Sequence, residues 1–244
     1  MPDDALTLPG WTFEAELWDE GHRLVAGIDE AGRGALAGPV VVAVVVLPVT
    51  THPFVDSKTV GQAQRESLAA GVRERALVWA LVEASAGEVD AIGVLQATLA
   101  AAERGLRALA GLAVPVAELV RRVEAPLDAV VTDYLRLPTQ RWGEWQGPRG
   151  LRHPPRADAR SFQVAAASLL AKTHRDALMR AAAVHWPEYG FERHKGYAVP
   201  AHRFALAHHG PCPLHRRSFR PVADLGLPRG LEPTEEPTCP TPSA

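Results

Sequence analysis

Residues 24–47 read LVAGIDEAGRGALAGPVVVAVVVL, and this stretch decides the fold. Residues 24–28 are a short apolar run between turn-forming residues, which is typical of a strand buried on both faces. A longer apolar run at 40–47 begins only about a dozen residues later. A connection this short favours an antiparallel neighbour, because a parallel crossover needs more chain. The stretch therefore predicts two adjacent antiparallel strands in the centre of a sheet.

Two carboxylates and a glycine-flanked arginine follow the first of these strands. Side chains alternate across a strand, so Asp29 and Glu30 can share one metal site only if the strand ends or bends at Glu30. The next two residues, Ala-Gly, predict that break. Gly32 and Gly34 have no Cβ atoms, so a phosphate or sugar can approach Arg33 and the nearby amides closely. The pattern predicts a metal site beside an anion-binding loop; the alternative is an acidic turn between two strands.

The composition is that of an ordinary globular protein. A chain of 244 residues with 47% hydrophobic and 22% charged residues can bury a full core, and we expect one principal domain. The acidic start MPDDA lacks the features of a signal peptide, and no apolar run approaches the length of a membrane span. Of the two cysteines, Cys239 lies in a tail rich in Pro, Thr and Glu, so no structural disulfide is expected. We expect a cytoplasmic monomer without membrane contact.

The net charge of −2 conceals a strong segregation of charge along the chain. Residues 1–135 hold 10 Lys and Arg against 19 Asp and Glu, whereas residues 136–220 hold 15 against 5. A basic segment joined to clustered carboxylates favours a metal-dependent enzyme that acts on a polyphosphate. A solvated basic face that balances an acidic one is the structural alternative.

The remaining pattern alternates helices and strands. Periodicity and turn residues predict helices at 11–20, 62–75, 89–110, 164–184 and 200–208, strands at 76–84 and 127–132, an edge strand within 152–160, and an irregular loop at 138–155 containing Trp142 and Trp145. Little fixed structure is expected after Pro221.

Two further carboxylates lie near predicted strand ends. Asp133 directly follows the strand at 127–132, and Asp158 lies near the end of the edge strand, before a long helix. Parallel neighbouring strands would bring both together with the first pair. An all-oxygen site without His or Cys suits Mg²⁺ or Mn²⁺, and two ions about 4 Å apart can activate water and stabilise the leaving oxygen of a phosphodiester. Asp158 also suits a helix cap.

Several separated motifs make the chain resemble the ribonuclease HII family from Trp11 to Val222. The motifs are GIDEAGRG at 27–34 with GPV at 38–40, DSK at 56–58, AAASLLAKTHRD at 165–176, YGF at 189–191, HKGY at 194–197 and HRRSF at 215–219. The resemblance implies a ribonuclease H-like mixed α/β sheet of about five strands, the first three antiparallel, flanked by helices. It also implies an extension at 1–20, a catalytic domain at 21–184, a helical C-terminal region at 185–222 that clamps the substrate, and a disordered tail at 223–244.

The resemblance implies a role for each site residue. Asp29, Glu30, Asp133 and Asp158 match the metal-binding and catalytic carboxylates, and Gly32, Arg33 and Gly34 match the loop that reads the 2′-hydroxyl. Recognition must concentrate on this group, because it distinguishes RNA from DNA. Tyr197 matches a tyrosine that packs on the sugar at the RNA–DNA junction, and Lys58 and Lys172 match positions near phosphates.

The reaction implied is hydrolysis on the 5′ side of a ribonucleotide in RNA–DNA hybrids or in DNA with embedded ribonucleotides. Two ions of Mg²⁺ or Mn²⁺ would take part, and the products would carry 3′-hydroxyl and 5′-phosphate ends, as ribonucleotide removal from DNA requires. The chain departs from the family pattern at Tyr134, where glycine is usual, and at Arg156-Ala157, where Lys-Gly is common. The segment between Asp133 and Asp158 is also longer than expected.

Four alternatives compete with this interpretation. Ribonuclease HIII shares the fold but usually carries a separate amino-terminal domain, for which the residues before Asp29 are too few. A non-catalytic nucleic-acid-binding module would not need all four carboxylates. A nucleotide phosphate loop is disfavoured, since residues 32–38 are not followed by Lys-Ser/Thr. A zinc site made by His208, His209, Cys212 and His215 is disfavoured by its irregular spacing.

Overall fold

One mixed sheet forms the centre of the molecule. The computed structural model describes residues 8–121, 127–137 and 147–225. Within these ranges six strands pair in the order β4-β3-β2-β1-β5-β6, with bounds β1 Val25–Ala31, β2 Val40–Val46, β3 Val78–Ala84, β4 Glu118–Arg121, β5 Ala129–Thr132 and β6 Gly150–Arg152. β1 to β4 are antiparallel to one another in succession, whereas β5 runs parallel to β1 and β6 runs parallel to β5.

The predicted fold class and its three antiparallel strands are confirmed, but the strand count is corrected. The described residues contain six strands rather than about five, because both edges carry very short strands. β4 has four residues and was missed, and β6 has three residues and ends before the prolines that follow it. Prolines cannot donate to a ladder, which limits this edge strand to Gly150–Arg152.

The helices occupy nearly all the predicted positions. Their bounds are α1 Thr12–Asp19, α2 Gln62–Arg75, α3 Ala86–Ile92, α4 Val94–Leu109, α5 Phe162–His185, α6 Phe191–His194, α7 Pro200–His209 and α8 Arg220–Ala223, with short 3₁₀ helices η1 Ala157–Ala159 and η2 Pro187–Tyr189. The prediction of one continuous helix over 89–110 was wrong. Gly93, with φ +82°, separates α3 from α4 by a conformation that a glycine adopts without steric cost.

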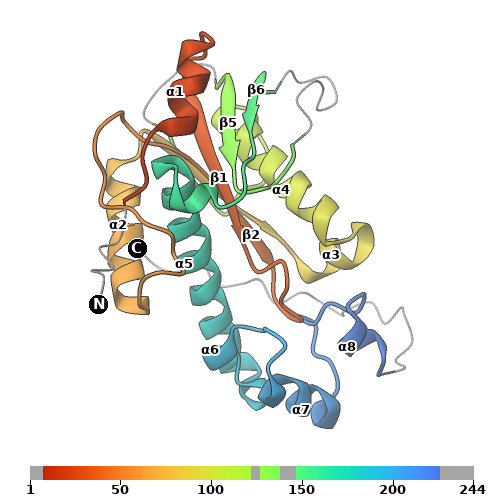
Figure 1. Cartoon of the computed structure of the whole chain (residues 1–244). Helices are drawn as coiled ribbons and strands as arrows, with labels where there is room; N and C mark the ends of the chain where they lie inside the picture. Colours follow the sequence, from red (N-terminus) through yellow and green to blue (C-terminus); the bar gives the residue numbers. More distant parts are fainter. Residues whose placement is uncertain (1–7, 122–126, 138–146, 226–244) are drawn as a thin grey trace.

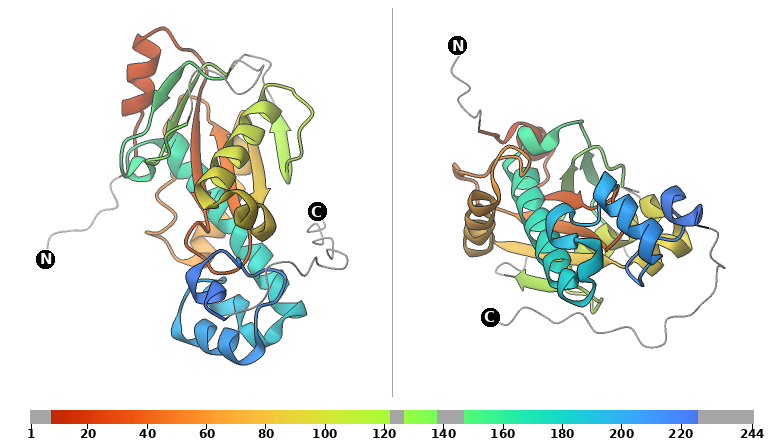
Figure 2. Two further views of the ribbon diagram at one scale, coloured as in Figure 1. Left: turned by 90° about the vertical axis from the view of Figure 1, so that its right-hand side faces the viewer. Right: turned by 90° about the horizontal axis from the view of Figure 1, so that it is seen from below.

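Helices cover both faces of the sheet, as Figures 1 and 2 show. α4 packs against the face that carries Val42, Val44 and Val82. α5 and α2 cover the opposite face, which carries Val41 and Val45. Valines at successive positions of β2 are all buried, because each face of this strand contacts a helix.

The beginning of α5 is fixed very closely against β1. A Cβ at Gly27 would lie 2.2 Å from the backbone carbon of Gln163, so only glycine allows this approach. The buried amide of Gln163 donates to Val25 O at 2.6 Å and accepts from Leu47 N at 2.8 Å. These contacts fix the first turn of α5, and with it the preceding η1, against β1.

A group of small helices lies beyond one end of the sheet (Figures 1 and 2). Its own core contains Met179 from the end of α5 with Tyr189, Phe191, Ala205 and Cys212. The proposed domain boundaries at 21–184 and 185–222 stay predictions.

Two sequence predictions fall on undescribed parts. The tryptophans Trp142 and Trp145, and nearly all of the predicted tail, lie outside the described residues. Among the helices that are described, none combines the length and apolar character needed to cross a membrane.

Candidate functional site

The register between β1 and β5 brings two carboxylates level with each other. Ile28 pairs with Thr132 at the end of the parallel ladder, so the next residues along each strand are Asp29 and Asp133. Asp29 is only 7% exposed. Two carboxylates more than a hundred residues apart thus meet at the carboxyl end of the central parallel pair.

The strand was expected to end or bend at Glu30, but it ends one residue later, at the Ala31-Gly32 break. β1 continues to Ala31, with Asp29 opposite Ala43 and Glu30 opposite Val42. Because side chains alternate, Asp29 points to the face covered by α5 and Glu30 points to the face covered by α4. The two carboxylates therefore approach the end of the sheet from opposite faces.

Asp158 reaches the same place from η1. It is 3% exposed, and the residue before it is tied to β5, since Ala157 N donates to Asp133 Oδ1 at 3.0 Å. Lys58 Nζ lies 2.8 Å from Asp158 Oδ2. The structure thus brings the third and fourth predicted carboxylates to the first two.

Burial and neighbouring acidic charges raise the pKa values of three of these carboxylates. Burial raises the pKa of Asp29 well above its ordinary value, and the charges of Glu30, Asp158 and Asp133 raise it further. Burial also raises the pKa of Glu30, although Arg33 partly opposes this effect. The pKa of Asp133 is raised by burial and by Asp158. The raised pKa values of Asp29, Glu30 and Asp133, beside the further carboxylate of Asp158, are typical of a site for cations.

Two basic side chains neutralise part of this charge. Arg33 Nη1 donates to Glu30 Oε1 at 2.9 Å, and Lys58 pairs with Asp158. Burial alone would lower the pKa of Lys58, but the hydrogen bond to Asp158 and the nearby acidic charges raise it above its ordinary value. Sequence reasoning did not assign Asp56 to the site. Burial raises the pKa of its carboxylate, and the charge of the nearby Asp158 raises it further.

The donor set fits a hard divalent cation such as Mg²⁺ or Mn²⁺. All candidate ligands are carboxylate oxygens, and Glu30 Oε2 is buried without a hydrogen-bond partner among the described residues. Within those same residues, no three His, Cys, Asp or Glu side chains are close enough to hold one ion as they stand. Glu30 and Asp158 are instead engaged by Arg33 and Lys58.

Two buried arginines hold the loop at 32–39 by donating hydrogen bonds to its backbone carbonyl oxygens. Arg175 donates to Ala37 O at 3.0 Å and to Pro39 O at 2.9 Å, and Arg216 donates to Gly38 O at 2.8 Å and to Arg33 O at 2.9 Å. Both side chains are 0% exposed. Their roles were missed from the sequence, because a buried arginine that binds backbone carbonyls has no charged partner that a sequence pattern could reveal.

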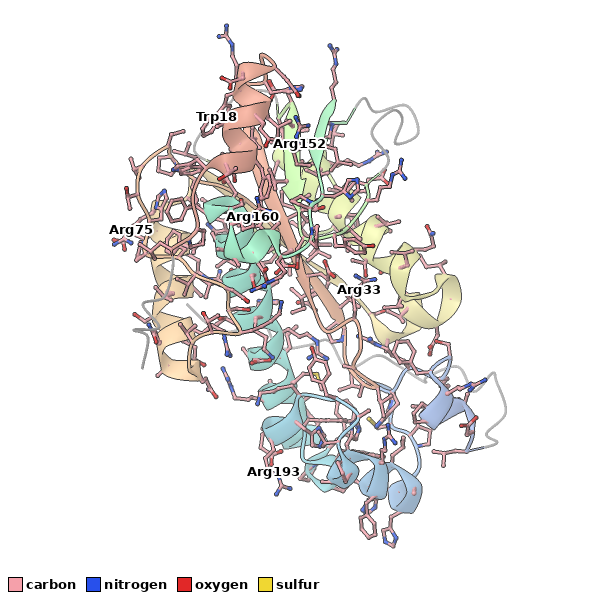
Figure 3. All side chains as sticks on the ribbon, viewed as in Figure 1. Trp18, Arg33, Arg75, Arg152, Arg160 and Arg193 are labelled. Atoms are coloured by element: carbon pink, nitrogen blue, oxygen red, sulfur yellow. The ribbon has the colours of Figure 1, made fainter. Side chains whose placement is uncertain are left out.

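The glycines of this loop play different parts. Gly32 has φ +95°, and a Cβ there would lie 1.9 Å from Arg175 Nε, so a side chain has no room. No described atom lies within 4 Å of a Cβ built at Gly34, which leaves the backbone there open. Arg33 projects beside the end of β1 with its side chain 42% exposed (Figure 3). The loop therefore presents an accessible backbone and a guanidinium next to the carboxylates.

Tyr197 and Lys172 lie together on the Arg175 side of this loop. The Tyr197 ring centroid is 5.3 Å from Arg175 Cζ and 5.7 Å from Lys172 Nζ, and Lys172 also pairs with Asp176 at 2.7 Å. Arg175 thus connects Tyr197 to the loop that contains Gly32, Arg33 and Gly34. The predicted site residues consequently form two neighbouring groups, with Lys58 in the carboxylate group and Lys172 in the tyrosine group.

The histidines near Cys212 form a hydrogen-bonded core. Cys212 Sγ is 3.2 Å from His215 Nδ1, and His215 Nε2 is 3.0 Å from His202 Nε2, whereas His208 and His209 are exposed on α7. Burial lowers the pKa of His215 to about 3. Burial favours the neutral forms of His202, Cys212 and His215, which pack together among the C-terminal helices.

The sheet is mixed, and its central parallel pair brings carboxylates to one end, beside a glycine-rich loop. This arrangement defines a nuclease of the ribonuclease H fold. The family model for ribonuclease HII matches residues 26–222. The chain is 51% identical over 215 residues to a ribonuclease HII of Thermus thermophilus, covering 88% of this chain and 95% of the relative. It is 46% identical over 217 residues to that of Syntrophotalea carbinolica, covering 87% and 92%. The chain belongs to the ribonuclease HII family.

Solved structures share the fold. The ribonuclease H2 of Pyrococcus horikoshii superposes with a TM-score of 0.63 at 22% identity, covering 83% of this chain and 97% of that one. The RNase HII of Archaeoglobus fulgidus, solved in complex with PCNA, gives a TM-score of 0.60 at 25% identity, covering 84% and 98%. Because the chain belongs to the ribonuclease HII family, it is an RNase H endonuclease, and its family is metal-dependent and acts on RNA–DNA hybrids.

Proposed function

We propose that this chain hydrolyses the phosphodiester on the 5′ side of a ribonucleotide, in RNA–DNA hybrids and in DNA duplexes with embedded ribonucleotides. The products carry 3′-hydroxyl and 5′-phosphate ends, and the reaction serves the removal of ribonucleotides from DNA. The observation that carries this proposal is the meeting of Asp29, Glu30, Asp133 and Asp158 beside the open backbone at Gly34.

In this proposal the four carboxylates hold Mg²⁺ or Mn²⁺. When bound there, such ions would supply the chemistry that activates a water and stabilises the leaving oxygen. Asp29, the most central of the four, faces both Asp133 and Asp158, and the unpartnered Oε2 of Glu30 supports a ligand role for that residue. Asp133 also holds η1 through Ala157 N, which keeps Asp158 at the site.

Ribonucleotide recognition belongs to the loop at 32–34 and to Tyr197. Arg33 and the backbone around Gly34 are accessible, whereas Gly32 lets the chain pass close to Arg175. These donors can contact the 2′-hydroxyl and the adjoining phosphate, and Tyr197 lies on the same side to pack on the sugar. Lys58 and Lys172 supply positive charge to the phosphates on either side.

We further propose that residues 21–184 carry out catalysis and that residues 185–222 clamp the duplex, in a monomeric enzyme. Residues 1–20 form the amino-terminal extension, and 223–244 the tail. The basic balance of 136–220 supports this division, because non-specific affinity for nucleic acid comes mainly from phosphate contacts. The cytoplasmic location stays a prediction.

The test compares DNA duplexes that contain one ribonucleotide or none, each with Mg²⁺ or Mn²⁺. Wild-type protein should cut only the ribonucleotide duplex, on its 5′ side. Asp29→Asn and Asp158→Asn should lower kcat by more than about 100-fold, since loss of groups that merely support metal ligands already costs about 10- to 100-fold. Both variants should still bind the duplex.

Asp19→Asn is the matched control, because Asp19 is exposed on α1. It should cleave like the wild type. Failure of the wild type to cut the ribonucleotide duplex with either metal would refute the proposal, and full activity of Asp158→Asn would remove that residue from the site.

A further inference from the structure

Tyr134 is a large aromatic residue that has a left-handed backbone conformation and a ring exposed to solvent. It follows Asp133 directly, has φ +56° and is 75% exposed. The left-handed conformation disfavours residues with a large side chain and is kept only where the surroundings impose it. Burial of the ring cannot compensate for this conformation, since the ring lies mostly in solvent.

Hydrogen bonds between neighbouring residues of the chain and to the segment before η1 fix the backbone position of Tyr134. Thr132 Oγ1 donates to Leu135 O at 2.6 Å, and Leu135 itself is 2% exposed. Tyr134 N donates to Pro154 O at 3.3 Å, in the segment that leads to η1. The backbone of Tyr134 is therefore held between the end of β5 and the segment before η1, and its exposed ring lies on the rim of the carboxylate site.

A second rim residue shares this conformation. Arg156 has φ +58° and an exposed side chain, and it stands two residues before Asp158. An aromatic ring and a guanidinium thus flank the site on the β5 side, whereas Arg33 and Tyr197 belong to the side of the C-terminal helices. Exposed aromatic rings interleaved with positive charge are the usual means of packing on bases and sugars while contacting phosphates.

We propose that Tyr134 is a substrate-contacting residue whose ring packs on a nucleotide next to the scissile phosphate. The proposal rests on the proposed function, because the nucleic acid is the ligand of this rim. It explains why a bulky residue occupies a position where glycine would relieve the backbone: the ring contributes to binding at the expense of stability.

The test uses three variants and two independent measurements. Tyr134→Phe keeps the ring, whereas Tyr134→Gly and Tyr134→Asn remove it and suit the left-handed conformation. The affinity for a fluorescent DNA duplex with one ribonucleotide is measured by anisotropy without added divalent metal, and thermal unfolding is followed in parallel. Cleavage with Mg²⁺ or Mn²⁺ is recorded separately.

Tyr134→Gly and Tyr134→Asn should weaken duplex binding about tenfold, as expected for loss of one aromatic contact. Tyr134→Phe should bind within about twofold of the wild type. Tyr134→Gly should also raise Tm by about 2 °C or more. Higher stability with weaker binding separates a substrate contact from a structural role, which would lower both.

Unchanged affinity of the Gly and Asn variants would overturn the proposal, as would an equal loss in Tyr134→Phe. These outcomes do not depend on catalysis. A wild type that binds the duplex through Tyr134 but cuts nothing would refute the proposed function alone.

Discussion

At the residue scale, Asp29 shows how the site opposes the stability of the fold. Its carboxylate is buried among three other acidic side chains, and its pKa is raised well above the ordinary value. A group whose pKa is raised on folding binds its proton more tightly in the folded state. The fold is therefore destabilised as the pH rises through this raised pKa, and the full cost is present when Asp29 is ionised.

Asp29→Asn should consequently stabilise the metal-free protein while it abolishes cleavage. We expect the free energy of unfolding in EDTA at about pH 7.5 to rise by about 1–2 kcal/mol, because a buried charge next to like charges is replaced by a neutral amide. Urea unfolding of the wild type and the variant measures this difference. Destabilisation of the variant would contradict the stated repulsion, and Asp19→Asn provides the unaffected comparison.

The site residues could be predicted from the sequence only in part. The carboxylates were found because each follows a recognisable strand or precedes a recognisable helix, and parallel pairing then brings them together. The geometry of Glu30 was not found, because a break after Glu30 and a strand that continues to Ala31 look alike in the sequence. Tyr134 was noticed as unusual, but its positive φ depends on tertiary contacts with the segment at 154–157.

At the element scale, α5 is joined to the sheet by a charged histidine as well as by apolar packing. His174 Nε2 lies 2.8 Å from Glu83 on β3, and Nδ1 lies 3.1 Å from Glu118 on β4. Burial alone would lower the pKa of His174, but the two carboxylates raise it from 6.5 to about 9. The hydrogen bond from His174 and that from Arg73 lower the pKa of Glu118 to about 2. These contacts fix the edge strand β4, which the sequence did not predict.

His174→Gln should therefore destabilise the protein in a pH-dependent way. A folded-state pKa raised to about 9 gives a stabilisation that is complete below 6.5 and is lost as the pH rises through 9. We expect a loss of about 2 kcal/mol at about pH 6, allowing for the partial exposure of both glutamates, and a much smaller loss at about pH 10. Urea unfolding at these two pH values and midway between them measures the difference.

His185→Gln is the matched control for this measurement, because His185 is exposed at the end of the same helix. The control should remain within about 0.5 kcal/mol of the wild type at every pH. A loss in His174→Gln that did not change with pH would indicate packing rather than charge.

At the scale of the whole molecule, the sheet and the C-terminal helices meet at the loop 32–39. Arg216, from the segment before α8, reaches back to the carbonyls of Gly38 and Arg33, and Leu36 N donates to Gly196 O at 2.8 Å. Residues distant in sequence therefore set the shape of the loop proposed to read the sugar.

Arg216→Met should weaken discrimination more than overall binding. Loss of the guanidinium leaves carbonyls of Gly38 and Arg33 without these donors, so the loop should lose its fixed shape. We expect the ratio of affinities for ribonucleotide and all-DNA duplexes to fall by at least about fivefold, while all-DNA affinity changes less than about threefold. Competition binding at constant salt measures both affinities.

Arg75→Met serves as the control, since Arg75 is exposed on α2 (Figure 3). It should leave the ratio unchanged. An equal loss of affinity for both duplexes in Arg216→Met would show that this arginine supports binding in general rather than discrimination.

Arg33 pairs with Glu30 and Lys58 pairs with Asp158, so binding of a cation and binding of nucleic acid should be cooperative. Each basic group acts as an internal counterion, and it cannot neutralise its carboxylate and contact a phosphate at full strength at the same time. A divalent cation on the carboxylates would release both groups for nucleic acid, and a duplex that draws them away would leave the carboxylates ready for a cation. Linkage is reciprocal, so each ligand should increase the affinity for the other by the same factor.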